Sequence, residues 1–300
     1  QQNIFLPISA LFFSLIIFRN DRENPVSRTW LFSSISFSAW ALGLYGVTST
    51  NSAHVALFWQ YVCDVAAIFL PALYFNFIST LFKFKNRKWQ IFFLAVAFVL
   101  SLFSFTALFK LGVIPKYDFY WINPGPLYVL FPIYFGLHGL LAMGILIYQY
   151  FNKKNNPIIR GQVRNTLIAG VFGYCGGSTN FFPQFFNAYP YGNYLVILFI
   201  VFMVYGVLKY KLLSTKVISA QIFSTALILV FLFNVLRSTD IQQWLVNFAI
   251  FLVVSFFSML LVRSVNEEVK ARQQIETLAK ELESTNERLK ELDQQKAKLL

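Results

Sequence analysis

The sequence predicts an all-α, polytopic membrane protein of about nine spans that continues into a cytoplasmic, parallel coiled coil. Three observations favour this class. Hydrophobic residues make up 57% of the chain and charged residues 13%, against about 45–50% and 25% in soluble domains. Apolar stretches alternate with short polar links along most of the chain. The C-terminal segment is charged, and its apolar residues follow heptad spacing.

Most of the apolar stretches reach the ~20 residues that a helix needs to cross a bilayer. In chain order they are residues 3–18, 29–48, 54–82, 89–109, 127–151, 165–182, 193–209, 217–236 and 244–262. We therefore expect a seven-helix region over 1–216, two further transmembrane helices over 217–262, and a cytoplasmic helix over 263–300.

The distribution of basic residues predicts the orientation. Links that follow the first, third, fifth and seventh stretches carry 14 Lys and Arg residues, while the alternate links carry three, Lys110, Lys116 and Arg237. The positive-inside rule therefore places the N-terminus outside and the C-terminal helix in the cytoplasm. From Arg263 onward eight basic residues balance eight acidic ones, so the net charge of +12 belongs to the membrane part. We expect contact with anionic lipid headgroups and no nucleic-acid partner.

The C-terminal helix has the seam of a coiled coil. Apolar residues alternate at intervals of three and four, with Thr285 and Lys296 in the two gaps. The apolar seam residues are Ile275, Leu278, Leu282, Leu289, Leu292 and Leu299. This pattern predicts a parallel homodimer.

Ionisable residues are scarce inside the spans. Asp64 is the only acid within an apolar stretch, and His138 is the only histidine well inside one. Counted from the outer helix ends, both lie about 15–16 Å deep, so a pair between them is one hypothesis. An intramembrane ionisable residue indicates a functional site; a structural hydrogen bond and proton transport are the alternatives. The other candidates for ligand binding or signalling are Tyr61, Tyr134, Tyr174 and Asn180.

Two links on the expected outer side are rich in aromatic residues, namely 110–126 and 183–192. Two interpretations stay open: an aromatic belt at headgroup level, or a lid over an outward-facing pocket. The sequence contains no GxSxG, HExxH or Walker motif and no Cys/His metal cluster. We therefore expect no cofactor and no metal.

Several motifs carry a resemblance to a known family. They are NPGPLYVLFPIYFGLHGLL from 123, IIRGQVRNTLIAGVFGY from 158, and NFFPQFFNAYPYGNYLVILFIVFMVYGVLKYKLL from 180. With them, residues 1–216 resemble the seven-transmembrane N-terminal sensor region of bacterial membrane histidine kinases. The tail ELDQQKAKLL is similar to the segment before a kinase dimerisation domain. The two spans between 217 and 262 depart from the simplest form of that family.

The resemblance implies a receptor of a two-component system in the bacterial inner membrane. A signal from outside or within the membrane would pass through the last span to the coiled coil and control a kinase. The implied partners are a second copy of the chain, a response regulator, and a small amphiphilic or lipid-like ligand. We expect no ATP hydrolysis or phosphate labelling, because the 300 residues contain neither the acceptor-histidine box nor a nucleotide site. A diguanylate cyclase output and a transporter with an oligomerising tail are the alternatives.

Overall fold

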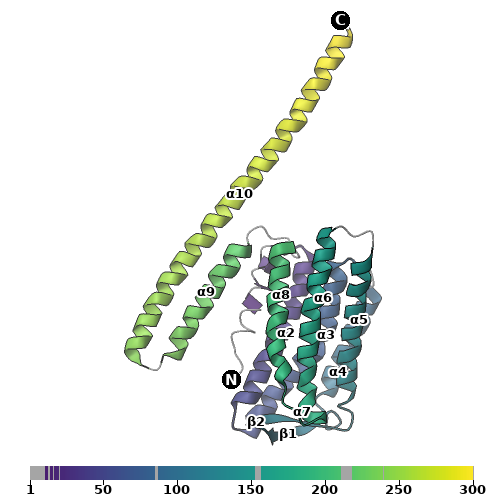
Figure 1. Ribbon diagram of the computed structural model, residues 1–300, viewed down its shortest axis with the longest axis vertical. Coiled ribbons are helices and arrows are strands. Elements are labelled where there is room, and N and C mark those ends of the chain that lie inside the picture. Colours follow the sequence, from purple (N-terminus) through teal and green to yellow (C-terminus); the bar gives the residue numbers. More distant parts are fainter. Residues whose placement is uncertain are drawn as a thin grey trace. The chain divides into compact units, whose positions relative to one another are not determined.

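The computed structural model describes residues 11–12, 14–15, 17–19, 21–84, 87–152, 157–210, 218–238 and 240–299. It divides into two compact units, Gln1–Thr215 and Lys216–Leu300, which are treated separately below. In chain order the elements are α2 (Pro25–Ser49), α3 (Ala53–Leu81), α4 (Arg87–Phe103), β1 (Lys110–Lys116), β2 (Phe119–Pro124), α5 (Leu130–Phe151), α6 (Pro157–Ser178), α7 (Phe182–Phe185), α8 (Leu195–Tyr210), α9 (Ile218–Arg237) and α10 (Ile241–Leu299), shown in Figure 1.

Among the described residues, four helices are long and apolar enough to cross a membrane. They are Pro25–Ser49, Ala53–Leu81, Leu130–Phe151 and Ile241–Val265. Most of the expected stretch 3–18 lies outside the described residues, and the described residues between 11 and 19 are helical. The helical class is confirmed, whereas the number of nine spans stays a prediction.

Small residues let α2 and α3 pack closely. A Cβ on Gly43 would lie 2.7 Å from the backbone nitrogen of Cys63, and one on Gly46 would lie 2.2 Å from the Trp59 ring. The hydroxyl of Ser36 on α2 also donates to the Ala66 carbonyl of α3 at 2.7 Å. The helix α3 continues through Pro71. The pair therefore forms a tightly packed part of the first unit.

The helix α4 ends at Phe103, six residues before the end of the apolar stretch 89–109. Hydroxyl groups bond to backbone carbonyls where it stops: Ser104 Oγ to Ser101 at 2.6 Å and Thr106 Oγ1 to Phe103 at 2.8 Å. Such local bonds offer the backbone an alternative to the helix. The apolar run therefore leaves the helix and turns toward β1, with Phe109 fully buried.

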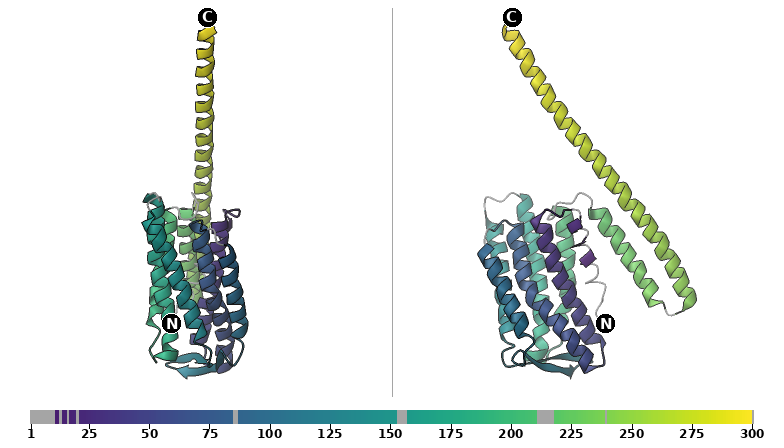
Figure 2. Two further views of the ribbon diagram at one scale, coloured as in Figure 1. Left: turned by 90° about the vertical axis from the view of Figure 1, so that its right-hand side faces the viewer. Right: turned by 180° about the vertical axis from the view of Figure 1, so that it is seen from behind.

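The two strands form an antiparallel hairpin that lies across one end of the helix bundle (Figures 1 and 2). The pairing is irregular between Lys110 and Gly112, and Gly112 has a φ of +136°. Only glycine adopts such a backbone conformation readily. At this bulge Lys110 is buried while the neighbouring Leu111 is 63% exposed. The bulge thus directs Lys110 into the bundle.

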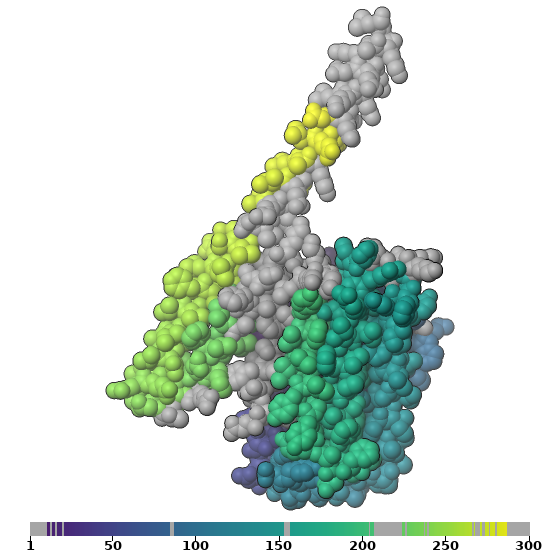
Figure 3. Space-filling model, viewed as in Figure 1, coloured from purple at the N-terminus to yellow at the C-terminus, as the bar shows by residue number. Residues whose placement is uncertain are grey.

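Two glycines of α6 allow close packing against neighbouring segments. A Cβ on Gly176 would lie 2.6 Å from the Gly192 carbonyl oxygen, and one on Gly173 would lie 3.1 Å from the Phe199 ring of α8. Helices α6 and α8 lie side by side, and their side chains form one continuous surface in Figure 3. The glycine-bearing side of α6 is therefore a packing surface within the first unit.

The second unit is a helical hairpin of α9 and α10. Asn247 Nδ2 of α10 donates to the Ser238 Oγ at 2.9 Å and to the Asn234 carbonyl at 3.2 Å, which ties the turn together. The helix α10 is continuous over 59 residues. At 1.5 Å per residue it is about 88 Å long, so one helix contains both the last apolar stretch and the charged segment.

Candidate functional site

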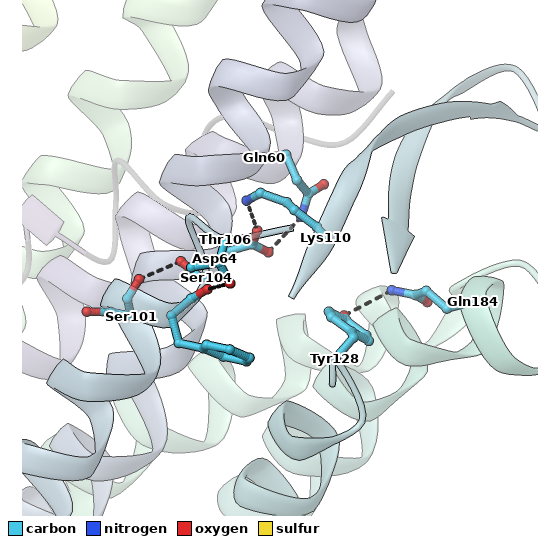
Figure 4. Close-up of polar contacts among 9 residues, drawn as sticks. Gln60, Asp64, Ser101, Ser104, Thr106, Lys110, Tyr128 and Gln184 are labelled. Atoms are coloured by element: carbon cyan, nitrogen blue, oxygen red, sulfur yellow. Dashed lines mark hydrogen bonds and ion pairs between the residues drawn. The ribbon is translucent and has the colours of Figure 1, made fainter. Parts of the chain in front are cut away.

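A buried ion pair joins α3 to the start of β1 (Figure 4). Lys110 Nζ donates to Asp64 Oδ2. The exposed fraction is 3% for Asp64 and 4% for Lys110. Because 46 positions separate the two residues in sequence, the contact ties the hairpin to the middle of a candidate membrane span.

Two further side chains of α3 complete this group. Gln60 lies one turn before Asp64, and its Nε2 donates to Asp64 Oδ1 at 2.8 Å. The Nζ of Lys110 lies 3.6 Å from the centroid of the Tyr61 ring, within the range of a cation–π interaction. The Tyr61 ring stacks on Phe105 with centroids 5.1 Å apart. We call Gln60, Tyr61, Asp64 and Lys110 the Asp64 cluster.

Burial dominates the electrostatics of this cluster. It lowers the pKa of the Lys110 ammonium, while attraction to Asp64 favours the charged form and opposes that shift. Removing two ions from water costs several kcal/mol per ion. The ion pair, the Gln60 amide and the Tyr61 ring offset this cost together, so neither charge is stable here without the other.

The hypothesis of an Asp64–His138 pair is wrong in this structure. Instead of Asp64, His138 Nδ1 faces the Tyr134 carbonyl oxygen at 2.9 Å, and its ring packs on Tyr134 and Phe93 at 4.2 and 4.5 Å. The pair was expected because Asp64 and His138 lie at similar depths along their helices. That comparison leaves out the link 110–126, which folds into the end of the bundle. That fold brings a lysine to Asp64, and a lysine is a stronger partner for a carboxylate than a neutral imidazole.

Two predicted tyrosines have buried hydroxyl groups. Among the described residues, neither Tyr134 Oη nor Tyr174 Oη has a hydrogen-bond partner, and the same holds for His138 Nε2. The Tyr174 ring covers Gly139, because a Cβ there would lie 2.7 Å from it, and packs edge-on against Tyr74 at 5.8 Å. His138, Tyr134 and Tyr174 therefore belong to a separate group around α5, away from the partners of Asp64.

Asn180 forms a reciprocal amide pair with Asn193. Asn180 Nδ2 donates to the Asn193 oxygen at 2.8 Å, and Asn193 Nδ2 donates back at 3.1 Å. Asn180 also donates to the Gly177 carbonyl at 3.0 Å. These bonds join the turn after α6 to the turn before α8, and a role of Asn180 in ligand binding or signalling stays a prediction.

The two aromatic links contact one another. Lys116 Nζ donates to the Pro183 carbonyl, and Gln184 Nε2 donates to the Tyr128 hydroxyl at 3.1 Å. The Tyr189 ring packs on Phe119 and Tyr117 at 5.8 and 5.5 Å. The links thus form an ordered cap on the hairpin end of the bundle, and the belt and lid interpretations remain predictions.

Of the four residues in the Asp64 cluster, the sequence analysis identifies Asp64 and Tyr61 as candidate binding or signalling residues. It does not identify Lys110 or Gln60. The predicted topology places Lys110 in the outer link 110–126, directly after an apolar stretch. The available signal was the rarity of basic residues in the outer links, which contain only three. Gln60 stands four positions before Asp64, a spacing that puts both side chains on one helix face.

The arrangement suits the recognition of a cation and includes no nucleophile with an adjacent base. In the part of the chain that the structure describes, no three His, Cys, Asp or Glu residues gather into a possible metal site. The fold and the cluster together define a helical membrane protein with a buried charge pair under a cap.

A scan of protein families matches residues 4–217 to the N-terminal 7TM region of histidine kinases. The match covers more than half of the chain, so the chain belongs to this family, as the resemblance predicted. A search among curated proteins and a search among solved structures gave no match. The family and the apolar helices together indicate a membrane location.

Proposed function

We propose that the chain is the sensing part of a two-component histidine kinase and that α10 is its output element. The bundle of the first unit receives the signal, and α10 carries it to a kinase domain that phosphorylates a response regulator. The family match supports a kinase over the cyclase and transporter alternatives. The observation that carries the proposal is the continuity of α10 from an apolar span into a charged rod.

The rod offers an apolar seam to a second copy. Ile275, Leu278 and Leu282 are 64%, 63% and 66% exposed. Their heptad spacing is that of a coiled coil, in which the same residues of a partner helix cover them. We infer a parallel homodimer, because the two copies lie in the same orientation in one membrane.

The topology follows from the charge of the links. With the basic links in the cytoplasm, the N-terminus and the hairpin lie outside the inner membrane of a bacterium and the rod lies inside. The bundle contributes seven spans, and α9 and α10 contribute two more. The cap then faces the compartment from which a small amphiphilic ligand or a lipid reaches the bundle.

Autophosphorylation of the full-length kinase in membrane vesicles tests this function. Lys substitutions at Leu282 and Leu289 should abolish the transfer of phosphate from ATP by separating the two copies. Lys substitutions at Ser284 and Gln294, which lie off the seam, should leave it intact. Equal activity of both double variants would contradict an output through a dimeric rod.

A further inference from the structure

One turn of α3 carries the groups that recognise a primary ammonium ion. Asp64 supplies the carboxylate, with Gln60 fixing its second oxygen at 2.8 Å. Tyr61 supplies an aromatic face 3.6 Å from the bound nitrogen, and this face is held by stacking on Phe105. A carboxylate opposite an aromatic face suits an organic ammonium, whereas hard metal cations prefer six or more oxygen ligands.

The ammonium group that these α3 side chains contact belongs to Lys110 of β1. The side chain of Lys110 enters from the irregular first position of β1, where the ladder is broken before Gly112. Bulges of this kind redirect a side chain and are common beside functional sites. The receptor groups Gln60, Tyr61 and Asp64 are all on α3, so they stay together when Lys110 leaves.

We propose that Gln60, Tyr61 and Asp64 form a binding site for a small primary alkylamine, with Lys110 as its built-in occupant. The inference rests on the proposed sensor function, because it names the ligand class of that sensor. An amine that takes the place of Lys110 frees the start of β1 from α3. A tethered lysine has an effective concentration in the millimolar range or above, so a free amine competes at millimolar concentration or through additional apolar contacts.

Chemical rescue in the purified chain tests the site without any kinase readout. In Lys110→Ala the buried Asp64 loses its cation, and the melting temperature should fall. Addition of n-butylammonium chloride should raise it again by several degrees with saturation, whereas sodium chloride at the same ionic strength should not. The double variant Asp64→Asn/Lys110→Ala should show no response to the amine.

A second measurement covers the case in which Lys110→Ala does not fold without the amine. n-Butylammonium, which matches the lysine side chain from Cβ to Nζ, is then added during the purification of Lys110→Ala and should increase the yield of folded protein. The proposal is overturned if n-butylammonium gives neither a melting shift nor an increased yield, or if the double variant responds equally. Failure of the kinase experiment above with intact rescue would reject the output role and leave the amine site standing.

Discussion

At the scale of residues, a buried charge pair joins the hairpin end of the bundle to α3. Asp64 and Lys110 are both buried, and they form an ion pair with each other. Replacing a buried ion pair as a whole is often tolerated, whereas removing one member leaves an uncompensated charge. The pair therefore gives this site a strong coupling between two elements that are distant in sequence.

The first prediction concerns this coupling. Asp64→Asn and Lys110→Met should each lower the free energy of unfolding by about 3–5 kcal/mol. The double variant should lose less than the sum of the two, because neither charge is then stranded. Thermal melts of the four proteins in one detergent measure the cycle. Strict additivity would show that the two side chains do not act as a pair.

A second prediction separates two kinds of buried tyrosine. Tyr128→Phe removes the bond from Gln184 and should cost about 1 kcal/mol. Tyr174→Phe removes a hydroxyl that has no partner among the described residues, so the melting temperature should change little. A larger loss for Tyr174→Phe than for Tyr128→Phe would instead show that the Tyr174 hydroxyl binds a ligand or water in the membrane.

The sequence alone singles out Asp64 as an acid in an apolar stretch, but it does not identify the partner of Asp64, and a binding or signalling role of Asp64 stays a prediction. An isolated acid in an apolar stretch is visible from composition alone, because the cost of burial makes it exceptional. The partner, Lys110, is brought to Asp64 by the folding of the link between α4 and α5. The depth of a residue along its own helix does not predict how such a link folds. Asn180 illustrates the same limit, since its pair with Asn193 arises from the close approach of α6 and the turn before α8.

At the scale of elements, helix boundaries in this chain are set by local hydrogen bonds as much as by hydropathy. The apolar run 89–109 predicted one span, but hydroxyl groups of Ser104 and Thr106 bond to carbonyls at the end of α4. Of the apolar residues that follow, Phe109 is fully buried, whereas Phe105 and Leu108 are 56% and 49% exposed. Hydropathy therefore predicted neither where this helix ends nor which of the following residues are buried.

The third prediction concerns the contact between α2 and α3. Gly43→Ala would place a Cβ 2.7 Å from the Cys63 backbone, and backbone atoms move less readily than side-chain ends. We expect a loss of about 1–3 kcal/mol in the free energy of unfolding.

Gly136→Ala and Gly144→Ala are matched controls on α5, because a Cβ at either position meets nothing within 4 Å. Both should be neutral or stabilising by up to about 1 kcal/mol through helix propensity. If Gly43→Ala melts at the same temperature as the controls, α2 and α3 are not packed as described.

At the scale of the whole molecule, one continuous helix unites a membrane segment with a rod. The sequence predicted both parts from different signals, hydropathy for 244–262 and heptads from Ile275 onward. The absence of Pro and Gly between them predicted the continuity, and α10 confirms it. The second copy was predicted from the heptad seam alone, and it stays a prediction.

The fourth prediction concerns this second copy. Leu282→Lys/Leu289→Lys should halve the mass of the purified chain in detergent, since each charge falls on the seam. Ser284→Lys/Gln294→Lys should keep the mass of the dimer. Light scattering with correction for bound detergent measures both. A dimer that survives the seam substitutions would move the main contact to the membrane part.

The central claim is that α10 acts as a rigid output helix, and a series of insertions tests it most directly. One to seven alanines inserted between Arg263 and Ile275 of the full-length kinase rotate the seam by about 100° per residue relative to the span. Autophosphorylation in membrane vesicles should rise and fall with helical phase and return to its original level at seven residues, which is two turns of a coiled coil. Activity that is indifferent to the number of inserted residues, or that declines steadily with it, would contradict the account.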